Sequence, residues 1–279
     1  MSEEQLKKLL QTVLKSPKYS NVSEDLIRNI GGRELSKRRN LKTAVKATKN
    51  KLHQIGGAYF LKKPEYNAWL KRLEAAKRAG NDESFRKICA EIMSYHYSTR
   101  ERLEILDEFY TKIYSLIPPV HSVIDVACGF HPVAIPWMPF SGKVKYCACD
   151  VYRDMMEFLG KFLVMTGVGG YAEVCDVVQH VPDSRADLAF VLNAIPCLEQ
   201  VDKSAALRVL ESINSSFLAV SFPVRTLGGR EKDMRKYYEA RFKKLTEKKE
   251  WSIQRIEFKS EMVFLVEKEA STKQKVDEQ

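Results

Sequence analysis

Residues 120–130 read VHSVIDVACGF, a stretch typical of a buried strand that runs directly into a tight turn. The apolar β-branched residues of this strand are Val120, Val123, Ile124 and Val126. Two small residues, Ala127 and Cys128, then lead to Gly129. At the carboxyl end of a parallel strand, such a turn lets a ligand approach the backbone closely. The stretch therefore predicts a cofactor site in an open α/β sheet, although a buried strand that ends in an ordinary turn has the same pattern.

Three acidic residues accompany the first three predicted strands. Asp125 lies within the first strand, Asp150 ends the run KYCACD, and Asp176 follows the third strand. In an open α/β sheet the strand ends line one crevice, so we expect all three acids to face it. Asp150 would accept ribose hydroxyl groups there, and Asp176 an adenine amino group. The chain has no GxxxxGK[ST] motif and no second phosphate-binding glycine. S-adenosylmethionine, a nucleoside with a cationic centre, therefore fits better than a dinucleotide or a triphosphate.

The C-terminal part of the chain alternates between strand-like and helix-like runs. Strands are predicted near residues 122–127, 144–149, 171–175, 187–192 and 216–222, and helices near residues 152–166, 203–213 and 232–246. Two final runs, WSIQRIEF and EMVFLVEK, predict a hairpin. This order predicts the α/β fold of class I (Rossmann-like) S-adenosylmethionine-dependent methyltransferases. Its seven-stranded sheet would end in an antiparallel hairpin and follow an all-α N-terminal extension.

Positive charge is concentrated near the N-terminus. Residues 1–60 contain 13 Lys and Arg against 5 Asp and Glu, whereas residues 111–226 contain 9 against 11. This division predicts a polyanionic partner held by a basic appendage, although a basic face that serves solubility alone has the same composition. We expect a helical docking domain over residues 1–105, a methyltransferase domain over 106–270 and a disordered tail over 271–279.

A helix predicted over residues 40–55 has one basic face. The members of this face are Lys42, Lys46, Lys49 and His53. Three further cations, at residues 37–39, precede the helix. The face is the best candidate for contact with phosphate groups, although many lysine-rich helix faces are only solvated.

The six cysteines lie mostly in apolar runs, without CxxC pairs or neighbouring ligand histidines. They indicate reduced core residues of a cytoplasmic protein, with no metal site. The N-terminal sequence MSEEQLKKLLQ has no apolar signal region, and no run approaches the roughly 20 apolar residues that span a bilayer. We therefore expect a cytoplasmic protein without membrane contact.

Arg102 is predicted in the first turn of a helix, because Ser98 and Glu101 have capping-box spacing. A cation at that position opposes the helix dipole, so its presence needs another reason. An anionic ligand group is one such reason. A surface ion pair with Glu101 or Glu104 is another.

The segment after the fourth strand, LNAIPCLE, places Asn193 and Pro196 where a methyl acceptor would enter. It is loosely similar to the Asn-Pro-Pro-aromatic motif of amino methyltransferases, although Asn193 could equally cap the following turn. After the fifth strand, SFPVRTLGGR supplies a basic, glycine-rich loop with Arg225 and Arg230. This loop is suited to gripping a nucleic-acid backbone near the target base.

Several strings together resemble one family, the aminoglycoside-resistance 16S rRNA methyltransferases of the Arm/Rmt type, which methylate N7 of guanine 1405 in the decoding site. The strings are KSPKYSNV (15–22), KLHQIGGAY (51–59), HYSTRERL (96–103), DVACGFHPVAIP (125–136) and SFPVRTLGGR (221–230). They span almost the whole chain in the order that the family has.

The resemblance implies roles for individual residues. Arg102 would bind the methionine carboxylate of S-adenosylmethionine, and Ala127 and Gly129 would contact the methionyl part. The remaining cofactor-binding residues would be Asp150 at the ribose with its neighbour Val151, and Asp176 and Val177 at the adenine.

The resemblance also implies a partner, the 16S rRNA of the intact 30S subunit, and a monomer suits a protein that docks on so large a particle. The basic residues that the resemblance implies in rRNA contact are Lys18, Lys49, Lys71 and Arg72. The basic helix face adds Lys42 and Lys46, and the loop after the fifth strand adds Arg225 and Arg230. Acquired family members carry Phe-Lys-Leu where this chain has Leu192-Asn193-Ala194. A lysine role therefore cannot be transferred, and we expect Asn193 to orient the target base.

The implied reaction is methyl transfer from S-adenosylmethionine to N7 of guanine 1405, which confers aminoglycoside resistance. Two alternatives stay open. One is methylation of another rRNA base, at an adenine N1 or an amino group. The other is a ribosome-binding factor that has the same fold without catalysis.

Overall fold

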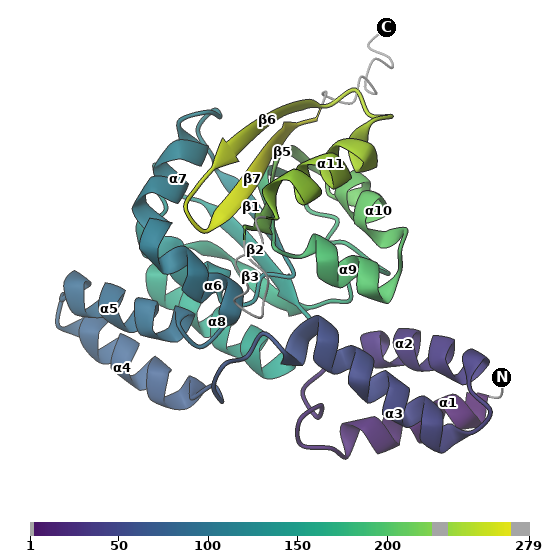
Figure 1. Ribbon diagram of the computed structural model, residues 1–279. Coiled ribbons are helices and arrows are strands. Elements are labelled where there is room, and N and C mark those ends of the chain that lie inside the picture. The colour runs from purple at the N-terminus through teal and green to yellow at the C-terminus, as the bar shows by residue number, and fades with distance from the viewer. Residues whose placement is uncertain (1–2, 225–233, 269–279) are drawn as a thin grey trace, which may run out of the picture.

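The structure is a computed structural model that describes residues 3–224 and 234–268 (Figure 1). Its strands are β1 (Ser122–Val126), β2 (Lys145–Asp150), β3 (Gly169–Val174), β4 (Ala186–Leu192), β5 (Ser215–Pro223), β6 (Ser252–Glu257) and β7 (Glu261–Glu267). They form one sheet in the order β3-β2-β1-β4-β5-β7-β6. Strands β1 to β5 are parallel, and β7 is antiparallel to both of its neighbours. The predicted seven-stranded sheet with its terminal hairpin is confirmed.

The central strands are apolar on both faces because helices cover both faces. Successive residues of a strand point to opposite sides, so Val123 and Ile124 of β1 belong to two separate cores. The Val123 side is covered by α7 (Leu106–Tyr114), the 3-10 helix η3 (His131–Trp137) and α8 (Arg153–Thr166). The Ile124 side is covered by α9 (Ile195–Val201), α10 (Ala205–Ser212) and α11 (Arg235–Thr246). Figure 1 shows these two groups of helices flanking the sheet.

A three-helix bundle precedes the sheet and lies to one side of it (Figure 1). It consists of α1 (Glu3–Leu14), α2 (Glu24–Lys37) and α3 (Leu41–Leu52). Its own core includes Leu9, Val13, Ile27, Ala44 and Leu52. The side chains of Ser23 and Asn40 cap α2 and α3 by accepting backbone N–H bonds.

Gly31 lies inside α2. A Cβ atom built on Gly31 would come 2.5 Å from Leu9 Cδ2, so this glycine lets α1 and α2 approach closely. A glycine at this position therefore serves helix packing and not a turn.

The remaining N-terminal helices pack against the sheet domain itself. After the π-helix η1 (His53–Gly57), helices α4 (Tyr66–Arg78) and α5 (Asp82–Met93) form a hairpin. Their apolar residues share one core with the Val123 side of the sheet, and the ring centroids of Trp69 and Phe130 are 5.7 Å apart. Of the expected helical extension over residues 1–105, only the first part has a core separate from the sheet.

The segment around Arg102 differs from the expectation. Helix α6 (Tyr97–Arg102) starts after His96, and the 3-10 turn η2 (Leu103–Ile105) separates it from α7. Ser98 Oγ lies 3.1 Å from His96 Nδ1 and makes no capping bond. Arg102 is therefore the last residue of α6, where a cation is favoured by the helix dipole. The predicted capping box, and the argument that Arg102 opposes the dipole, are wrong.

Within the described ranges, no helix has both the length and the apolar content needed to cross a membrane. The tail expected to be disordered, residues 271–279, lies outside those ranges.

Candidate active site

A pocket opens at the carboxyl ends of the first four strands, where an open α/β sheet binds its ligands. The sheet domain contributes Ala127, Gly129, Asp150, Val151, Tyr152, Met155, Cys175, Asp176, Val177, Val178, Leu192, Asn193, Ala194, Cys197, Leu198 and Val201. The N-terminal helical segments contribute Leu26, Ile55, Gly56, Tyr59, Phe60, His96 and Ser98. The structure thus brings six of the seven predicted cofactor residues together, and closes the pocket with helices that precede the sheet.

The turn after β1 has the tight backbone that the sequence predicted. Ala127 and Gly129 both adopt left-handed conformations, with φ angles of 51° and 52°. A Cβ atom on Gly129 would lie 2.9 Å from His96 Cε1, so no side chain fits between the turn and the His96 ring. Gly129 is therefore required both for its φ angle and for the close approach of His96.

Asp150 lies beside this turn. Its carboxylate accepts hydrogen bonds from the backbone N–H groups of Gly129, at 3.0 Å, and of Val151, at 2.7 Å. Burial nevertheless raises the pKa of Asp150 to about 6. The carboxyl group is thus held in position, and its charge is poorly solvated until a ligand supplies further donors.

Asp176 follows β3 and is 5% exposed. Its Oδ1 accepts a hydrogen bond from the backbone N–H of Val178, at 3.1 Å. Its Oδ2 accepts two side-chain amide bonds, from Gln179 at 2.9 Å and from Asn29 of α2 at 3.1 Å. Both carboxylate oxygens are therefore oriented by the protein, one of them by the N-terminal bundle.

Asn193 follows β4 and lines the pocket in a left-handed conformation, with φ of 55°. Its backbone N–H donates to Ser221 Oγ, at 3.0 Å. The side chain is 8% exposed, and its Oδ1 has no hydrogen-bond partner within the described part of the chain. A buried amide without a partner is costly, so a ligand group is the natural complement of this atom.

Arg102 does not line the pocket. It is 1% exposed, and its Nε and Nη2 donate to the Glu261 carboxylate at 2.8 and 2.6 Å. Glu261 also accepts a short hydrogen bond from Ser221 Oγ. A buried chain of contacts therefore connects Arg102 to Asn193 through Glu261 and Ser221. Sequence reasoning missed Glu261, which lies 159 positions from Arg102.

Asp125 also lies away from the pocket, so the expectation that it faces the crevice is wrong. It is 1% exposed and accepts a hydrogen bond from the Tyr146 hydroxyl, at 2.8 Å. His131 Nδ1 lies at the same distance from the same carboxylate oxygen. Asp125 is therefore a polar group of the core beside η3, because alternate residues of β1 point away from the crevice face.

An aromatic wall from the helical segments was also missed. The rings of Tyr59 and His96 stack at 5.7 Å between centroids, and the Phe60 ring meets His96 edge-on at 5.5 Å. Cys197 Sγ lies 3.0 Å from the Tyr59 hydroxyl. Burial and the charge of Arg102 lower the pKa of His96 to about 4, so this ring is neutral at physiological pH. Tyr59 and His96 lie within the strings 51–59 and 96–103, and those strings were the sequence signal for this wall.

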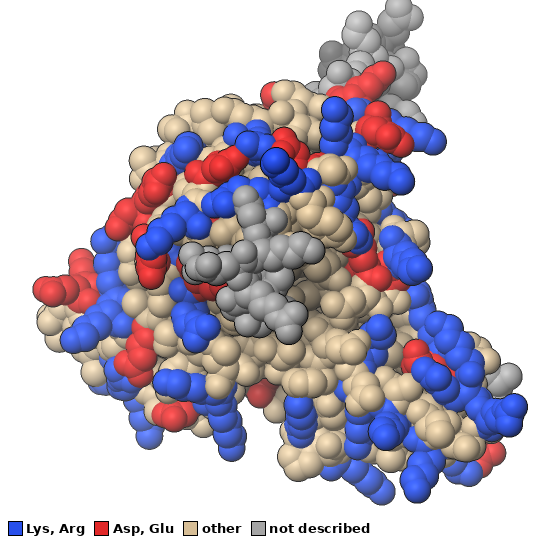
Figure 2. Space-filling view, viewed as in Figure 1, with Lys and Arg blue, Asp and Glu red and all other residues tan. Residues whose placement is uncertain are grey.

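The predicted rRNA-binding residues lie mostly on exposed helix faces. Lys42, Lys46 and Lys71 are exposed, and Lys18 Nζ is 3.1 Å from His53 Nδ1. Arg72 makes a two-bond ion pair with Glu91, at 2.7 and 2.6 Å. Figure 2 shows Lys and Arg side chains gathered over the bundle at the lower right. Lys49 is half-buried on the same bundle, and the loop residues 225 and 230 lie outside the described ranges.

The sheet order, the small-residue turn after β1 and the acid that ends β2 define a class I S-adenosylmethionine-dependent methyltransferase. Two solved structures are similar over nearly the whole chain. The 16S rRNA methyltransferase RmtF in complex with S-adenosyl-L-homocysteine is 28% identical, covers 96% of this chain and 100% of its own, and has a TM-score of 0.79. The 16S rRNA methylase RmtB is 28% identical, covers 94% and 98%, and has a TM-score of 0.76.

The chain belongs to the FmrO family of ribosomal RNA methyltransferases, whose family model matches residues 15–266. A 16S rRNA (guanine(1405)-N(7))-methyltransferase from Micromonospora rosea is 34% identical over 268 residues, which is 95% of this chain and 98% of that protein. A protein of the same name from Serratia marcescens is 34% identical over 233 residues, covering 84% and 86%. These matches confirm the family that the sequence strings indicated.

Proposed function

We propose that the protein transfers the methyl group of S-adenosylmethionine to N7 of guanine 1405 of 16S rRNA in the 30S subunit. The observation that carries the proposal is the similarity to enzymes with that name, at 34% identity across 95% of the chain. The similarity includes the basic bundle as well as the sheet domain, so it covers the substrate-docking part and the catalytic part together. With this function the protein would act as a monomer in the cytoplasm, and it would confer resistance to aminoglycosides.

The pocket fits this cofactor, judged by its own geometry. The Asp150 carboxylate has room for further donors, which the two ribose hydroxyl groups supply. Asp176, with Val177 beside it, provides an oriented acceptor for the adenine amino group. The small residues Ala127 and Gly129 line the pocket where the methionyl part would lie. We infer these roles from position and chemistry together.

For Arg102 we infer a role in neutralising the methionine carboxylate. Its Nε and Nη2 are occupied by Glu261, which leaves Nη1 as the group that would act. Burial, with the charge of Arg102 as a second cause, lowers the pKa of His96, a residue that lines the pocket.

In this reaction the protein has to orient the reacting groups and does not have to transfer a proton. The bound cofactor supplies an electrophilic methyl group on its sulfonium. Guanine N7 carries a lone pair and no proton, so no general base has to act. The target base must leave its stack, at a cost of a few kcal/mol, which contacts from the basic bundle offset.

Asn193 is the residue that we assign to orientation of the target base. Its amide offers one acceptor and two donors, and the acceptor has no partner among the described residues. The aromatic wall at Tyr59 and His96 is available to cover the face of a flipped base. The basic loop predicted to hold the adjacent phosphate, residues 221–230, lies largely outside the described ranges.

The proposal is tested by methylating purified 30S subunits and free 16S rRNA with radiolabelled S-adenosylmethionine. The modified base is then mapped by borohydride and aniline cleavage followed by primer extension. We expect labelling of intact 30S subunits at guanine 1405. Labelling of free 16S or 23S rRNA without labelling of 30S subunits would contradict the proposal.

Drug susceptibility separates the proposed base from its neighbours. Expression in a susceptible host should protect against gentamicin-type and kanamycin-type drugs and spare apramycin activity. Protection against apramycin as well would indicate methylation of the neighbouring adenine. Full S-adenosylmethionine binding without any methylated base would indicate a ribosome-binding factor.

A further inference from the structure

The N-terminal bundle is connected to the cofactor pocket at two places. Just before α2, Val22 forms an isolated antiparallel bridge with Tyr152. Beside the bridge, the Ser23 N–H donates to the Val151 carbonyl at 2.7 Å, and the Arg153 N–H donates to the Asn21 carbonyl at 2.8 Å. The bundle is thus joined directly to the loop that follows Asp150.

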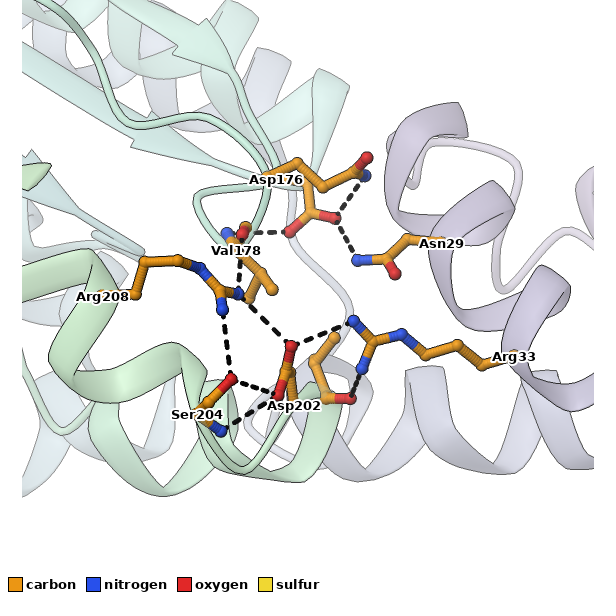
Figure 3. Close-up of polar contacts among 9 residues, drawn as sticks. Asn29, Arg33, Asp176, Val178, Asp202, Ser204 and Arg208 are labelled. Carbon is orange, nitrogen blue, oxygen red and sulfur yellow. Dashed lines mark hydrogen bonds and ion pairs between the residues drawn. The ribbon is translucent and has the colours of Figure 1, made fainter.

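The second connection is polar and runs from α2 to the loops after β3 and α9. Figure 3 shows Asn29 and Arg33 projecting from α2 toward Asp176 and Asp202. Arg33 Nη1 donates to the Val201 carbonyl at 2.8 Å, and Arg33 Nη2 to Asp202 at 3.1 Å. Asn29 Nδ2 donates to Asp176 Oδ2 at 3.1 Å.

The Asp176 carboxylate depends on α2 for its orientation. The backbone N–H of Val178 holds Oδ1, whereas Oδ2 is held only by side chains among the described residues, those of Asn29 and Gln179. Gln179 Nε2 also lies 3.2 Å from the Asp25 carbonyl of α2, so both donors to Oδ2 contact that helix. Because the donors fix a buried carboxylate, a ligand N–H group can bond to it from one direction only.

We propose that Asn29 is a positioning residue for adenine recognition: it fixes the plane of the Asp176 carboxylate, so that helix α2 of the basic bundle forms part of the specificity site for the cofactor. This inference rests on the proposed role of Asp176 at the adenine. It assigns to the docking bundle a second task, the recognition of the nucleobase of the cofactor.

The chemistry of the proposal is selectivity for an exocyclic amino group. Adenine presents an N–H donor at position 6, which an oriented carboxylate accepts. Hypoxanthine presents a carbonyl oxygen there, which the same carboxylate repels. A carboxylate free to rotate would distinguish these bases less well, because it would lose its alignment with the N–H bond.

The test compares two ligands by isothermal titration calorimetry on the full chain: S-adenosylhomocysteine and its hypoxanthine analogue, S-inosylhomocysteine. Asn29→Ala is expected to weaken S-adenosylhomocysteine binding by about tenfold and to change binding of the analogue by much less. Gln179→Ala is expected to act in the same sense. Combined with Asp176→Ala, the effect of Asn29→Ala should largely disappear, because the carboxylate it positions is gone.

Arg33→Ala is the matched control. It removes an ion pair between the same helix and the sheet domain without touching Asp176. General loosening of the bundle would weaken both ligands to a similar extent, and should do so in Arg33→Ala as well. A shared, ligand-independent loss in Asn29→Ala and Arg33→Ala would overturn the proposal, as would unchanged binding in Asn29→Ala.

Failure of the underlying assignment is distinguishable. If Asp176→Ala itself leaves the preference for adenine unchanged, the proposed role of Asp176 is wrong. If Asp176→Ala abolishes the preference and Asn29→Ala keeps it, only the positioning role of Asn29 is wrong. Circular dichroism of each variant confirms that the chain is folded.

Discussion

Asp150 is a carboxylic acid in surroundings that favour its neutral form, since burial raises its pKa to about 6. Ribose hydroxyl groups donate to the ionised form, so cofactor binding should lower this pKa and release a proton near pH 6. Affinity for S-adenosylhomocysteine is therefore expected to fall as the pH decreases from about 7 to about 5. Titration calorimetry in buffers of different ionisation enthalpy measures both the affinity and the proton release.

Asp150→Asn is the control for this pH dependence. It cannot ionise, so it should bind more weakly at neutral pH and lose the proton release. Equal proton release by the wild type and Asp150→Asn would show that another group titrates.

Gly129 offers a second test of the cofactor site. Gly129→Ala forces a left-handed alanine and brings its Cβ against the His96 ring, so this ring, which lines the pocket, must shift. We expect binding of S-adenosylhomocysteine to weaken by at least about tenfold, together with a loss of stability of about 1 kcal/mol.

Gly80→Ala is the matched control for Gly129→Ala, because both substitutions place an alanine in a left-handed backbone conformation. Gly80 has a φ of 62°, and no atom lies within 4 Å of its added Cβ. It should lower the thermal midpoint without changing cofactor affinity. A loss of affinity in both variants would assign the effect to global stability and not to the turn.

For single residues, the sequence predicted their places along strands and helices better than it predicted their hydrogen-bond partners. Asp150 ends β2 and Asp176 follows β3, and parallel strand ends meet at one edge of a sheet. The sequence placed Arg102 in the first turn of a helix that Ser98 would cap. The helix instead begins at Tyr97 and ends at Arg102. The Thr99 hydroxyl donates to the Met93 carbonyl at 2.7 Å, a contact that the capping pattern did not indicate. Glu261, the partner of Arg102, belongs to the last strand, and no local pattern reports such a distant pair.

Among the elements, the contact between α6 and β7 has the largest expected effect on stability. Arg102 and Glu261 are both almost completely buried. Glu261→Ala leaves a buried guanidinium without its partner, which should lower the free energy of unfolding by about 3–5 kcal/mol. Urea denaturation followed by circular dichroism measures the change.

Lys259→Ala in the same hairpin is the control. Lys259 pairs with Glu104, and both side chains are largely exposed, so its removal should have a far smaller effect. Replacing both buried partners by methionine should recover much of the loss. If Glu261→Ala were as stable as Lys259→Ala, the buried pair would contribute little.

The strands were predictable because buried parallel strands are continuous apolar runs, as β4 is from Leu188 to Leu192. Helix α9 was not predicted, since a seven-residue helix with a proline in its first turn has little periodicity. The inclusion of α4 and α5 in the core of the sheet also could not be predicted. The apolar faces of α4 and α5 indicate that other residues cover them. Only the tertiary structure shows that the covering residues belong to the sheet domain.

For the whole molecule, the basic face of α3 is expected to affect docking and not chemistry. Lys42 and Lys46 are exposed on α3. Lys42→Glu combined with Lys46→Glu should reduce kcat/KM for 30S subunits by at least about tenfold, and should weaken the dependence of binding on salt. Filter-bound methylation assays at several salt concentrations measure both effects.

Lys243→Glu combined with Lys244→Glu changes the net charge equally on α11, an element remote from the bundle in Figure 1. This control should retain near-normal activity. Equal losses in the two double variants would mean that total charge, and not the bundle, governs docking.

The pocket wall combines residues of the N-terminal helical segments with residues of the sheet domain, which matters for the design of inhibitors. Leu26, Ile55 and Tyr59 come from segments that are not part of the sheet fold shared with other methyltransferases of this class. A nucleoside analogue extended from the adenosine position onto these side chains would gain contacts that a sheet domain alone cannot offer. Such compounds provide a route to blocking this family while sparing other enzymes that use the same cofactor.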